Sequence, residues 1–384
     1  SNPTAGNVYL NGWIDFNQDG TIGAGEQIIT DVVAAPGNGT LNVPIFVPGS
    51  AQPGDVFARF RISSDSGLSM TGSASDGEVE DYIALVPPVD LGALPDIYNT
   101  SKTYAGARHV VDGVTRLDGS VDDEADGVPG TNANGDNLAN LNDEDGVQWP
   151  PVFLPNASTS ITVSVVTTDS AFLNAWIDWN GDGDFNDTLE RIVVTDTSYT
   201  SGTHVININT PAFITDTLYA RFRLTDNPGE ATEPTGLAPS GEVEDYVLMS
   251  LGNTVWLDNG QAGGIANNGK LDGGEKGVAN VAVELYRSGD NPLTVTPVAT
   301  TTTDAAGHYL FNGLQPGDYV VHIPSENFDA SGDPLYAALS STGAGNPNDN
   351  LDETSDENGI DDANPAANGI SSAAITLSIG DEPT

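Results

Sequence analysis

The chain has 384 residues, 55 of them acidic and 11 basic, which gives a formal net charge of -44. This balance excludes an electrostatic grip on nucleic acid or on anionic lipid, because both need patches of Lys and Arg. Several domains are expected at this length. The sequence contains no cysteine, so disulfides and thiol chemistry are excluded as well.

The first predicted element contains a calcium-loop pattern, WIDFNQDGTIGAGE, at residues 13–26. Its spacing fits the twelve-residue loop of an EF-hand, D-x-N-x-D-G-x5-E. The expected ligands are the side chains of Asp15, Asn17, Asp19 and Glu26 and the carbonyl of Thr21. The alternative is a polar turn that binds no metal. The flanking residues indicate strands, so the loop has no helix pair to open and we do not expect it to act as a switch.

Residues 1–86 form the first of two copies of one module. The stretches LNGWIDFNQDG, VFARFRI and GEVEDYIALV recur as LNAWIDWNGDG, LYARFRL and GEVEDYVLMS in residues 151–250. Apolar and polar residues alternate in both copies between clusters of Gly, Pro, Asn and Asp, which indicates antiparallel strands. We therefore predict an all-β chain of tandem Ig-like, Greek-key antiparallel β-sandwich domains joined by acidic, calcium-ordered loops. Trp13 and Trp176 are expected to anchor the loops in the core.

The charged residues of these strands allow two interpretations. Arg59 and Arg61 share one strand face, and Glu78 and Glu80 share one face of the GEVEDY strand, so cross-strand ion pairs are expected. The second copy repeats the arrangement with Arg221, Arg223, Glu242 and Glu244. Alternatively, Asp81 and its counterpart in the second copy reach a calcium ion beside the loop.

Residues 87–150 are rich in Asp, Asn and Gly and show little apolar periodicity. Such a composition would suit a flexible linker. The clustering of carboxylates in VDDEADG and NDEDG favours instead a segment that is ordered by calcium. The candidate ligands in this segment are Asp122, Glu124, Asp126, Asp143 and Asp145.

The second copy carries a shorter version of the loop, WIDWNGDGDFNDTLE, at residues 176–190. The ligands expected in its first positions are Asp178, Asn180, Asp182 and the carbonyl of Asp184. Glu190 falls one residue later than the pattern requires, and a bulge of one residue would restore it. Alternatively, Asn186 or Asp187 takes its place.

Residues 251–384 are expected to form a further small sandwich with an acidic insertion. A distorted third loop at residues 256–275 contains an insertion after its first aspartate. The candidate ligands of this loop are Asp258, Asn268, the carbonyl of Lys270, Asp272 and Glu275. Nearer the C-terminus, the acidic insertion adds Asp356, Asn358 and Asp361 as candidates. Calcium is thus expected at several sites.

These motifs resemble those of known families. The WIDFNQDG, RFRI and GEVEDY set resembles the GEVED-type domain of large bacterial surface proteins in both copies, and residues 87–150 are similar to the acidic stretch that precedes such domains. The run from GNTVWLD to GHYLFNGLQPGDYVVHIP resembles the B-type repeat of serine–aspartate-repeat adhesins, a collagen-adhesin B-like sandwich. The resemblance implies an extracellular, cell-surface stalk, adhesin or surface-layer component built of tandem calcium-bound β-domains.

Two departures from these families bear on assembly. The first copy lacks the strand that precedes the second at residues 158–166, and the last repeat ends before its closing strand. We therefore expect a fragment of a longer chain, or neighbouring chains that complete one another by strand donation, or both. Residues 373–379, AAITLSI, have the alternation and the length that a donated strand needs.

The sequence shows no catalytic constellation. Pairs of carboxylates are frequent by chance alone, the four histidines have no zinc-binding spacing, and no nucleophile elbow is present. We predict a non-catalytic, calcium-stabilised structural protein of the cell surface, either an adhesin stalk or a filament subunit. Its expected partners are itself or neighbouring domains and an unidentified cell-surface or host ligand, with no membrane insertion of this segment. The alternatives are a module that binds a glycan or a host protein and a spacer of a secreted enzyme.

Overall fold

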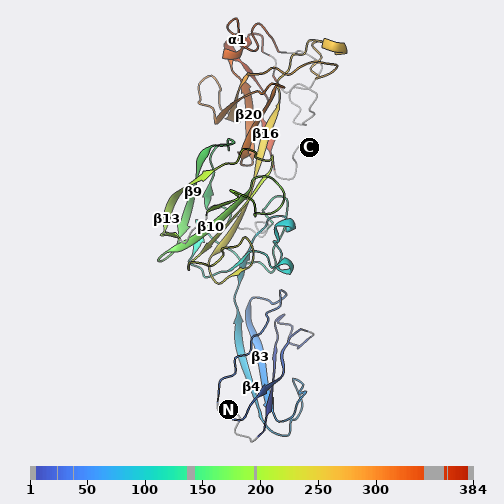
Figure 1. Cartoon of the computed structure of the whole chain (residues 1–384), viewed down its shortest axis with the longest axis vertical. Coiled ribbons are helices and arrows are strands. Elements are labelled where there is room, and N and C mark those ends of the chain that lie inside the picture. Colours follow the sequence, from blue (N-terminus) through green and yellow to red (C-terminus); the bar gives the residue numbers. More distant parts are fainter. Residues whose placement is uncertain are drawn as a thin grey trace.

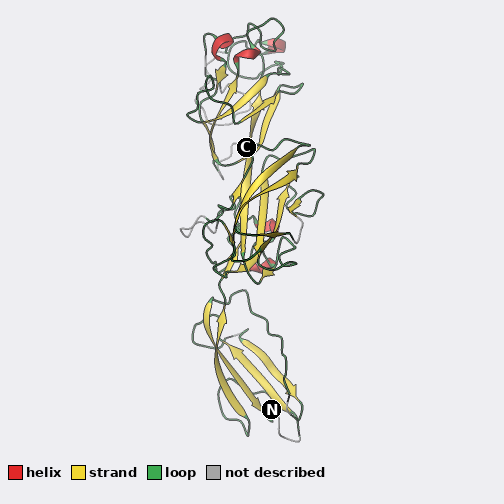
Figure 2. Cartoon of the chain, turned by 90° about the vertical axis from the view of Figure 1, so that its left-hand side faces the viewer, coloured by secondary structure: helices red, strands yellow, loops and turns green. Residues whose placement is uncertain are grey.

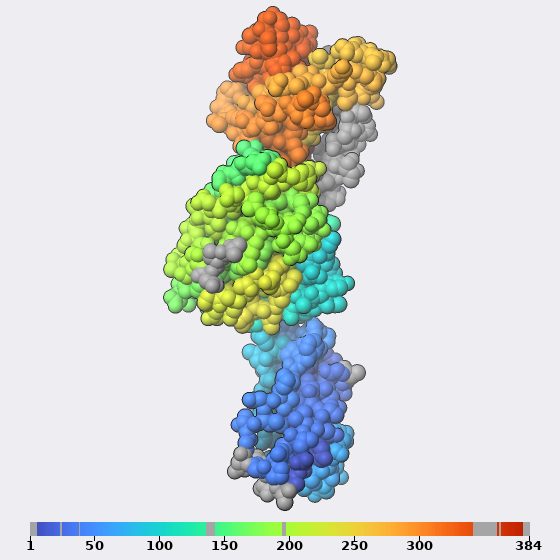
Figure 3. Space-filling view, in the orientation of Figure 1, coloured from blue at the N-terminus to red at the C-terminus, as the bar shows by residue number. Residues whose placement is uncertain are grey.

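The computed structural model describes residues 6–23, 25–37, 39–135, 143–193, 197–340, 359–360 and 362–378. Three units of β-structure follow one another along the long axis of the chain (Figure 1). Figure 2 shows that strands dominate every unit, and the space-filling view in Figure 3 shows the units as successive bodies. Among the described residues, helix is limited to short 3-10 turns and to the four-residue α1 (Pro365–Asn368). The all-β prediction is confirmed.

The first unit is a single antiparallel sheet with the strand order β2-β1-β3-β4. Its strands are β1 (Val8–Ile14), β2 (Gln27–Ala34), β3 (Gly54–Ser63) and β4 (Glu78–Val86). Alternation along β3 places Val56 and Ala58 on one face, where they pack with Ile14 and Phe16. Residues 39–50 contain no strand. The described part of this unit therefore has one sheet where a sandwich would have two.

The second unit is a sandwich of two sheets. One sheet has the order β11-β10-β14-β16, with β12 also on β10, and the other has the order β13-β9-β7, with β8 also on β9. The strands are β9 (Ser158–Val166), β10 (Ala171–Asp178), β11 (Arg191–Val193), β12 (Ser198–Tyr199), β13 (Gly202–Asn209), β14 (Leu218–Thr225) and β16 (Glu242–Thr254). Ile161, Leu173 and Phe222 are completely buried in the core. Trp13 and Trp176 are both buried, as predicted.

The described parts of residues 87–150 fold onto the second unit. The short strands concerned are β5 (Val89–Leu91), β6 (Arg108–Val110), β7 (Arg116–Leu117), β8 (Val147–Gln148) and β15 (Leu237–Ala238). β5, β6 and β15 form a small sheet of their own, whereas β7 and β8 pair with β9. Leu94 and Tyr98 are buried against Trp176 and Val247. This acidic stretch is thus an integral part of the second unit and not a flexible linker.

The third unit shares a strand with the second. β16 pairs with β14 from Glu242 to Leu248 and with β19 from Met249 to Thr254, so one strand runs through both units. The other strands are β17 (Ala282–Arg287), β18 (Ala299–Thr302), β19 (His308–Leu314), β20 (Gly317–Ile323), β21 (Ile370–Ser371) and β22 (Ile375–Leu377). The boundary that the sequence suggests between residues 250 and 251 therefore lies inside a continuous strand.

β22 occupies the position for which a closing strand was expected to be missing. It pairs with β20 of the same chain through residues Ile375 to Leu377. Leu377 is buried in the core of the third unit. The expectation that residues 373–379 fill a gap in a neighbouring chain therefore differs from the structure, in which the described part of this stretch completes its own sheet.

The shared strand generates a first prediction. A Cβ atom added at Gly252 would lie 2.3 Å from the carbonyl oxygen of Tyr309 and 2.7 Å from the side chain of Leu310. Gly252→Val should therefore force β16 and β19 apart and lower the free energy of unfolding of the third unit by about 1–3 kcal/mol. Urea denaturation measures the change.

Gly39→Val is the matched control, because no atom lies within 4 Å of the position of its added Cβ. Equal stability changes for the two variants would contradict the close approach of β16 and β19.

Candidate functional site

Three loops, at residues 15–26, 178–190 and 258–275, share one hydrogen-bond pattern. In each of them the first aspartate turns back over the loop and accepts the N–H of a glycine that has a positive φ. The three pairs are Asp15 with Gly20 at 3.0 Å, Asp178 with Gly183 at 3.0 Å and Asp258 with Gly269 at 2.7 Å. Loops with different sequences thus begin with the same turn.

The middle asparagine and the last glutamate of each loop also repeat. The asparagine oxygen accepts the N–H two residues later, in the pairs Asn17 with Asp19, Asn180 with Asp182 and Asn268 with Lys270. The glutamate accepts the N–H three residues earlier, in the pairs Glu26 with Gly23, Glu190 with Asp187 and Glu275 with Asp272. The chain therefore places the same oxygen-bearing groups in the same relation three times.

Two buried carboxylate oxygens in these loops lack a hydrogen-bond donor. They are Oδ1 of Asp15 and Oε1 of Glu190, and the two residues are only 5% and 1% exposed. An unsatisfied buried oxygen costs free energy. A calcium ion takes six to eight oxygens from carboxylates, amides and carbonyls. The donor set of the first two loops therefore fits calcium.

The carboxylates of these loops do not form a metal cage on their own. Within the described residues, no group of three or more His, Asp or Glu side chains is arranged to hold a metal ion. Seven of the expected contributors are exposed: Asn17, Asp19, Asn180, Asp182 and the residues Thr21, Asp184 and Lys270, whose carbonyls were proposed. An ion in these loops would therefore draw on asparagine and main-chain oxygens as well as on carboxylates.

The second loop has one extra residue before its glutamate. Leu189 adopts a φ of 76°, and its carbonyl accepts a hydrogen bond from the indole of Trp179 at 3.0 Å. This extra residue turns Glu190 into the loop. Burial, followed by the charge of Asp178 and its neighbours, raises the pKa of Glu190 to about 7. A cation beside Glu190 would favour its charged form.

In the third loop, the insertion does not separate Asp258 from the rest. Its Oδ1 atom accepts the N–H of Asn267 at 2.6 Å, in addition to the bond from Gly269 to Oδ2. Asp272 accepts a bond from the amide group of Asn268, and Glu275 accepts the N–H of Gly260 at 2.7 Å. Asn268, Asp272 and Glu275 are thus linked by hydrogen bonds, and Asp258 is bonded to the main chain on either side of Asn268.

The candidates in residues 87–150 divide into two groups. Asp122 and Asp143 come together, because the N–H of Asp122 donates to Oδ2 of Asp143 at 3.3 Å. Burial, followed by the charge of Asp122, raises the pKa of Asp143 to about 6. The other three candidates accept main-chain N–H groups elsewhere: Glu124 from Leu91, Asp126 from Lys102 and Asp145 from Gly119. Asp356, Asn358 and Asp361 lie outside the described residues.

One arginine of each copy pairs with an aspartate and not with the expected glutamate. Arg221 makes a two-pronged ion pair with Asp245 at 2.7 and 2.8 Å, and both side chains are completely buried. Arg59 pairs with Asp81 in the same way at 2.6 and 2.7 Å, but at the surface. The expected Arg–Glu pairs are wrong because alternation turns the arginines and the glutamates to opposite faces of the sheet. It follows that Asp245 faces an arginine and not a loop ion.

Glu242 and Glu244 hold the backbone at Leu117 and at Gly146 in place. Glu242 accepts the N–H of Leu117, and Glu244 accepts the N–H of Gly146 at 2.9 Å. Both glutamates are buried, which raises their pKa values well above the ordinary value. Oε1 of Glu242 lacks a hydrogen-bond partner, and the charge of Asp143 acts on this carboxyl group.

Two functional contacts involve residues that sequence reasoning did not select. The hydroxyl of Tyr98 donates to Oδ2 of Asp178 at 2.7 Å, so residues 87–135 touch the second loop. His109 is completely buried between Arg223, whose Nε lies 3.0 Å from its Nε2, and the carbonyl of Ser240, 2.8 Å from its Nδ1. No spacing motif marks either residue, because both contacts join segments that are far apart in the sequence.

Comparisons with known proteins support the resemblance that the motifs indicate. Residues 9–85 and 172–249 match the GEVED domain model, and residues 249–349 match the SdrD B-like domain model. Serine-aspartate repeat-containing protein F of Staphylococcus epidermidis is 28% identical over 47% of the chain and 9% of its own length. Protein C of the same type, from Staphylococcus aureus, is 31% identical over 33% of the chain and 13% of its own length.

Two further similarities have a more limited scope. Colossin-B of Dictyostelium discoideum is 36% identical over 22% of the chain and 2% of its own length. The crystal structure of BcpA, the major pilin subunit of Bacillus cereus, aligns over 87% of the chain and 88% of its own, with 9% identity and a TM-score of 0.19, which is too low to support an argument. The chain thus spans only a small part of the curated relatives named here. None of the described helices has the length and hydrophobicity to cross a membrane.

The two ion pairs generate a matched prediction. Arg221→Gln should lower the free energy of unfolding by about 3–5 kcal/mol, because it leaves the carboxylate of Asp245 buried without its partner. Arg59→Gln should change the stability little, because water solvates Asp81. Urea denaturation of both variants measures the difference, and similar losses would contradict the assigned burial.

His109 generates a prediction about pH. Burial, followed by the charge of Arg223, holds its pKa well below the ordinary value of 6.5. The unfolded chain therefore takes up a proton that the folded chain refuses. The stability contribution is complete above pH 6.5 and falls as the pH decreases below that value.

His109→Gln should flatten this acid-side loss in denaturation curves measured over a pH series. Replacement of the exposed His308 by Gln should leave it intact. Equal pH profiles for the wild type and His109→Gln would show that His109 does not contribute.

Proposed function

We propose that the chain is a calcium-stiffened structural segment of an extracellular surface protein. It carries two GEVED domains followed by an SdrD B-like domain. Its role is to hold domains apart along a stalk, and it does no chemistry on a substrate. Its relatives include serine-aspartate repeat-containing proteins. The domain models and these relatives support a place at the cell surface.

The observation that carries the proposal is the hydrogen-bond pattern that the three loops share. Each loop presents an aspartate, an asparagine and a glutamate, and each places them through equivalent main-chain bonds. A turn that served only to connect strands would not need the same acidic groups three times. Extracellular sites that bind calcium with a Kd of roughly 10⁻⁴ to 10⁻³ M would be occupied outside cells.

Bound calcium would act at the places where segments meet. The first loop joins β1 to β2, and the second joins β10 to β11. Tyr98 reaches the second loop from residues 87–135, so an ion there would also fix this segment to the sandwich. The third loop begins four residues after the shared strand β16 ends. Each ion would also offset part of the net charge of -44 and so reduce self-repulsion.

Asp122 and Asp143 are candidates for a further cation site. The main-chain N–H of Asp122 donates to Asp143, so the two residues lie close together. Oδ1 of Asp122 lacks a hydrogen-bond partner, and so does Oε1 of Glu242. A cation between them would relieve the repulsion that raises the pKa of Asp143. We therefore include this pair in the calcium proposal.

A filament subunit is the second candidate, and the first unit favours it. Its described residues form one sheet, and four apolar side chains after β2 are exposed. These side chains are Leu41, Ile45, Phe46 and Val47. A strand from another chain could complete this layer, as in known strand additions.

Calcium removal tests the proposed function. Chelation with EGTA should lower the melting temperature and increase the hydrodynamic radius, because each lost ion withdraws RT ln(1 + [Ca²⁺]/Kd), about 2.7 kcal/mol at one hundred times Kd. Glu190→Gln should reduce by one the number of calcium sites measured in a calorimetric titration. Glu233→Gln, an exposed carboxylate in a loop between β14 and β16, is the matched control.

An identical melting temperature and radius with and without calcium would refute the calcium proposal. Sedimentation at several protein concentrations in the same buffers would distinguish a monomeric stalk segment from a self-assembling filament subunit.

A further inference from the structure

The two GEVED domains differ in what covers one face of their main sheet. In the second domain this face lies under residues 89–110, here called the covering segment. Ile83 of the first domain is 65% exposed, whereas Val247 at the equivalent position is 8% exposed. Val79 is 51% exposed and its counterpart Val243 is 3% exposed. The sheet face that is covered in the second domain is therefore exposed in the first domain.

The ion pair at the centre of this face shows what the covering segment provides. In the second domain, Oδ2 of Asp245 accepts the N–H groups of Ala93 and Leu94 at 2.7 and 2.9 Å, besides its bonds from Arg221. A Cβ on Gly92 would lie 2.2 Å from the same oxygen, so the backbone approaches the pair as closely as glycine permits.

Arg59 and Asp81 form the same two-pronged pair in the first domain. Their side chains are 35% and 59% exposed, and among the described residues no main-chain N–H group is hydrogen-bonded to Asp81. The ion pair that contacts the covering segment in the second domain is therefore also formed in the first domain, where no described segment covers it.

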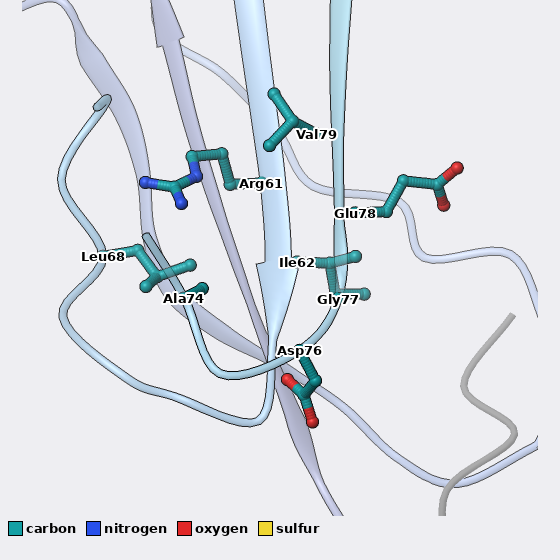
Figure 4. A pocket seen from close by; sticks show the side chains of 8 residues that line it. All are labelled: Arg61, Ile62, Leu68, Ala74, Asp76, Gly77, Glu78 and Val79. Carbon is teal, nitrogen blue, oxygen red and sulfur yellow. The ribbon is translucent and has the colours of Figure 1, made fainter. Parts of the chain in front are cut away.

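A hollow of about 330 Å³ lies next to Arg61 and Val79. In the second domain, Arg223, the counterpart of Arg61, contacts β6 at this place. Figure 4 shows Arg61 extending from β3 towards the loop that carries Leu68 and Ala74, while Glu78 points away from it. Arg61 donates to the carbonyls of Ser69 and Gly72, as Arg223 donates to those of Glu233, Thr235 and Gly236.

In the second domain, two groups of the covering segment lie at the equivalent place. His109 accepts a hydrogen bond from Arg223, and β6 pairs in parallel with β15 of the loop. Ala74 is the counterpart of Ala238 in β15, counted from the glutamates that begin the two GEVEDY strands. The hollow thus lies at the position that β6 occupies in the second domain.

We propose that this open face of the first domain, formed by Phe57, Arg59, Arg61, Val79, Asp81 and Ile83, is a docking site for an extended polypeptide segment with the chemistry of residues 89–110. The occupant brings a glycine and two main-chain N–H groups to Asp81, an apolar side chain to Ile83, and a short strand to the edge at Ala74. The occupant is a polypeptide segment other than residues 89–110, because β5 and β6 hold the covering segment itself on the second domain.

The chemistry of the face selects an extended peptide over other ligands. A bidentate carboxylate at the surface needs donors in a row, which an extended main chain provides. The apolar side chains around the pair exclude a highly charged partner, and residues 89–110 carry only Asp90 and Asp96 against Lys102 and Arg108. The proposal does not depend on calcium, because none of the residues that form the open face belongs to the three loops.

A synthetic peptide of residues 89–110, added to the full chain, tests the proposal. We expect saturable binding in calorimetry and slower hydrogen exchange in residues 64–76 and in β4. A second version attaches the peptide ahead of Ser1 through a flexible Gly/Ser linker, which raises its effective concentration to about the millimolar range. This tethered peptide should raise the melting temperature of the first domain.

Matched variants locate the contact. Asp81→Asn should weaken binding at least about tenfold, because a neutral amide oxygen accepts hydrogen bonds more weakly than a carboxylate. Glu80→Gln, on the opposite face of the same strand, should leave binding unchanged. A peptide with Gly92→Val should fail to bind, because its Cβ would clash with the carboxylate.

Three results would overturn the proposal. The first is an absence of protection in residues 64–76 and β4 with both the free and the tethered peptide. The second is binding that Asp81→Asn and the Gly92→Val peptide leave unaltered. The third is protection confined to the second domain, which would mean that the peptide only exchanges with the covering segment already in place there.

Discussion

The buried ion pair between Arg221 and Asp245 is the constraint around which the second unit is organised. Two opposite charges without access to water are tolerated only when hydrogen bonds satisfy their remaining donors and acceptors. Here the satisfaction comes from the main chain of residues 92–100 and from the carbonyl of Pro234. The stability of the sheet therefore depends on the covering segment and on the loop between β14 and β16, and both of these are parts of the domain itself.

The same principle explains why an acidic chain folds at all. Many of its carboxylates accept main-chain N–H groups, as Glu124 does from Leu91 and Glu244 does from Gly146. Such bonds turn a negative side chain into a structural clamp, and they are stronger than neutral hydrogen bonds. Among the described residues, the buried carboxylate oxygens without a donor include Oδ1 of Asp15 and Oε1 of Glu190, in two of the loops to which we assign cations, and Oδ1 of Asp122 and Oε1 of Glu242 at the further candidate site.

The sequence alone predicts the repeated parts of the molecule well. Alternation identifies the strands, the internal repeat aligns the two GEVED domains, and the first aspartate and the glutamate of each loop mark its two ends. Even the late position of Glu190 indicates the bulge at Leu189. These features depend on residues close together in the chain, where spacing carries the geometry.

Contacts between distant segments could not be predicted in the same way. Arg221 was expected to face a glutamate, and only the pairing register of β14 with β16 places it opposite Asp245. In the described part of residues 87–150, acidic side chains such as Glu124 and Asp126 accept main-chain N–H groups that lie 33 and 24 residues away in the chain, and these contacts leave no periodic pattern in the sequence. The contacts of Tyr98 and His109 could not be predicted for the same reason, since their partners lie 80 and 114 residues away.

The strand shared by the second and third units has a mechanical consequence. A pull on the two ends of the chain passes from one unit to the next along the backbone of β16, which is fastened to β14 on one side of the junction and to β19 on the other. Such a load shears rows of hydrogen bonds together instead of peeling them one by one. The junction between the first and second units has no such strand, since Pro87 and Pro88 separate β4 from β5. Under tension the molecule would therefore bend and align at the proline joint first, while the two C-terminal units bear force as one body.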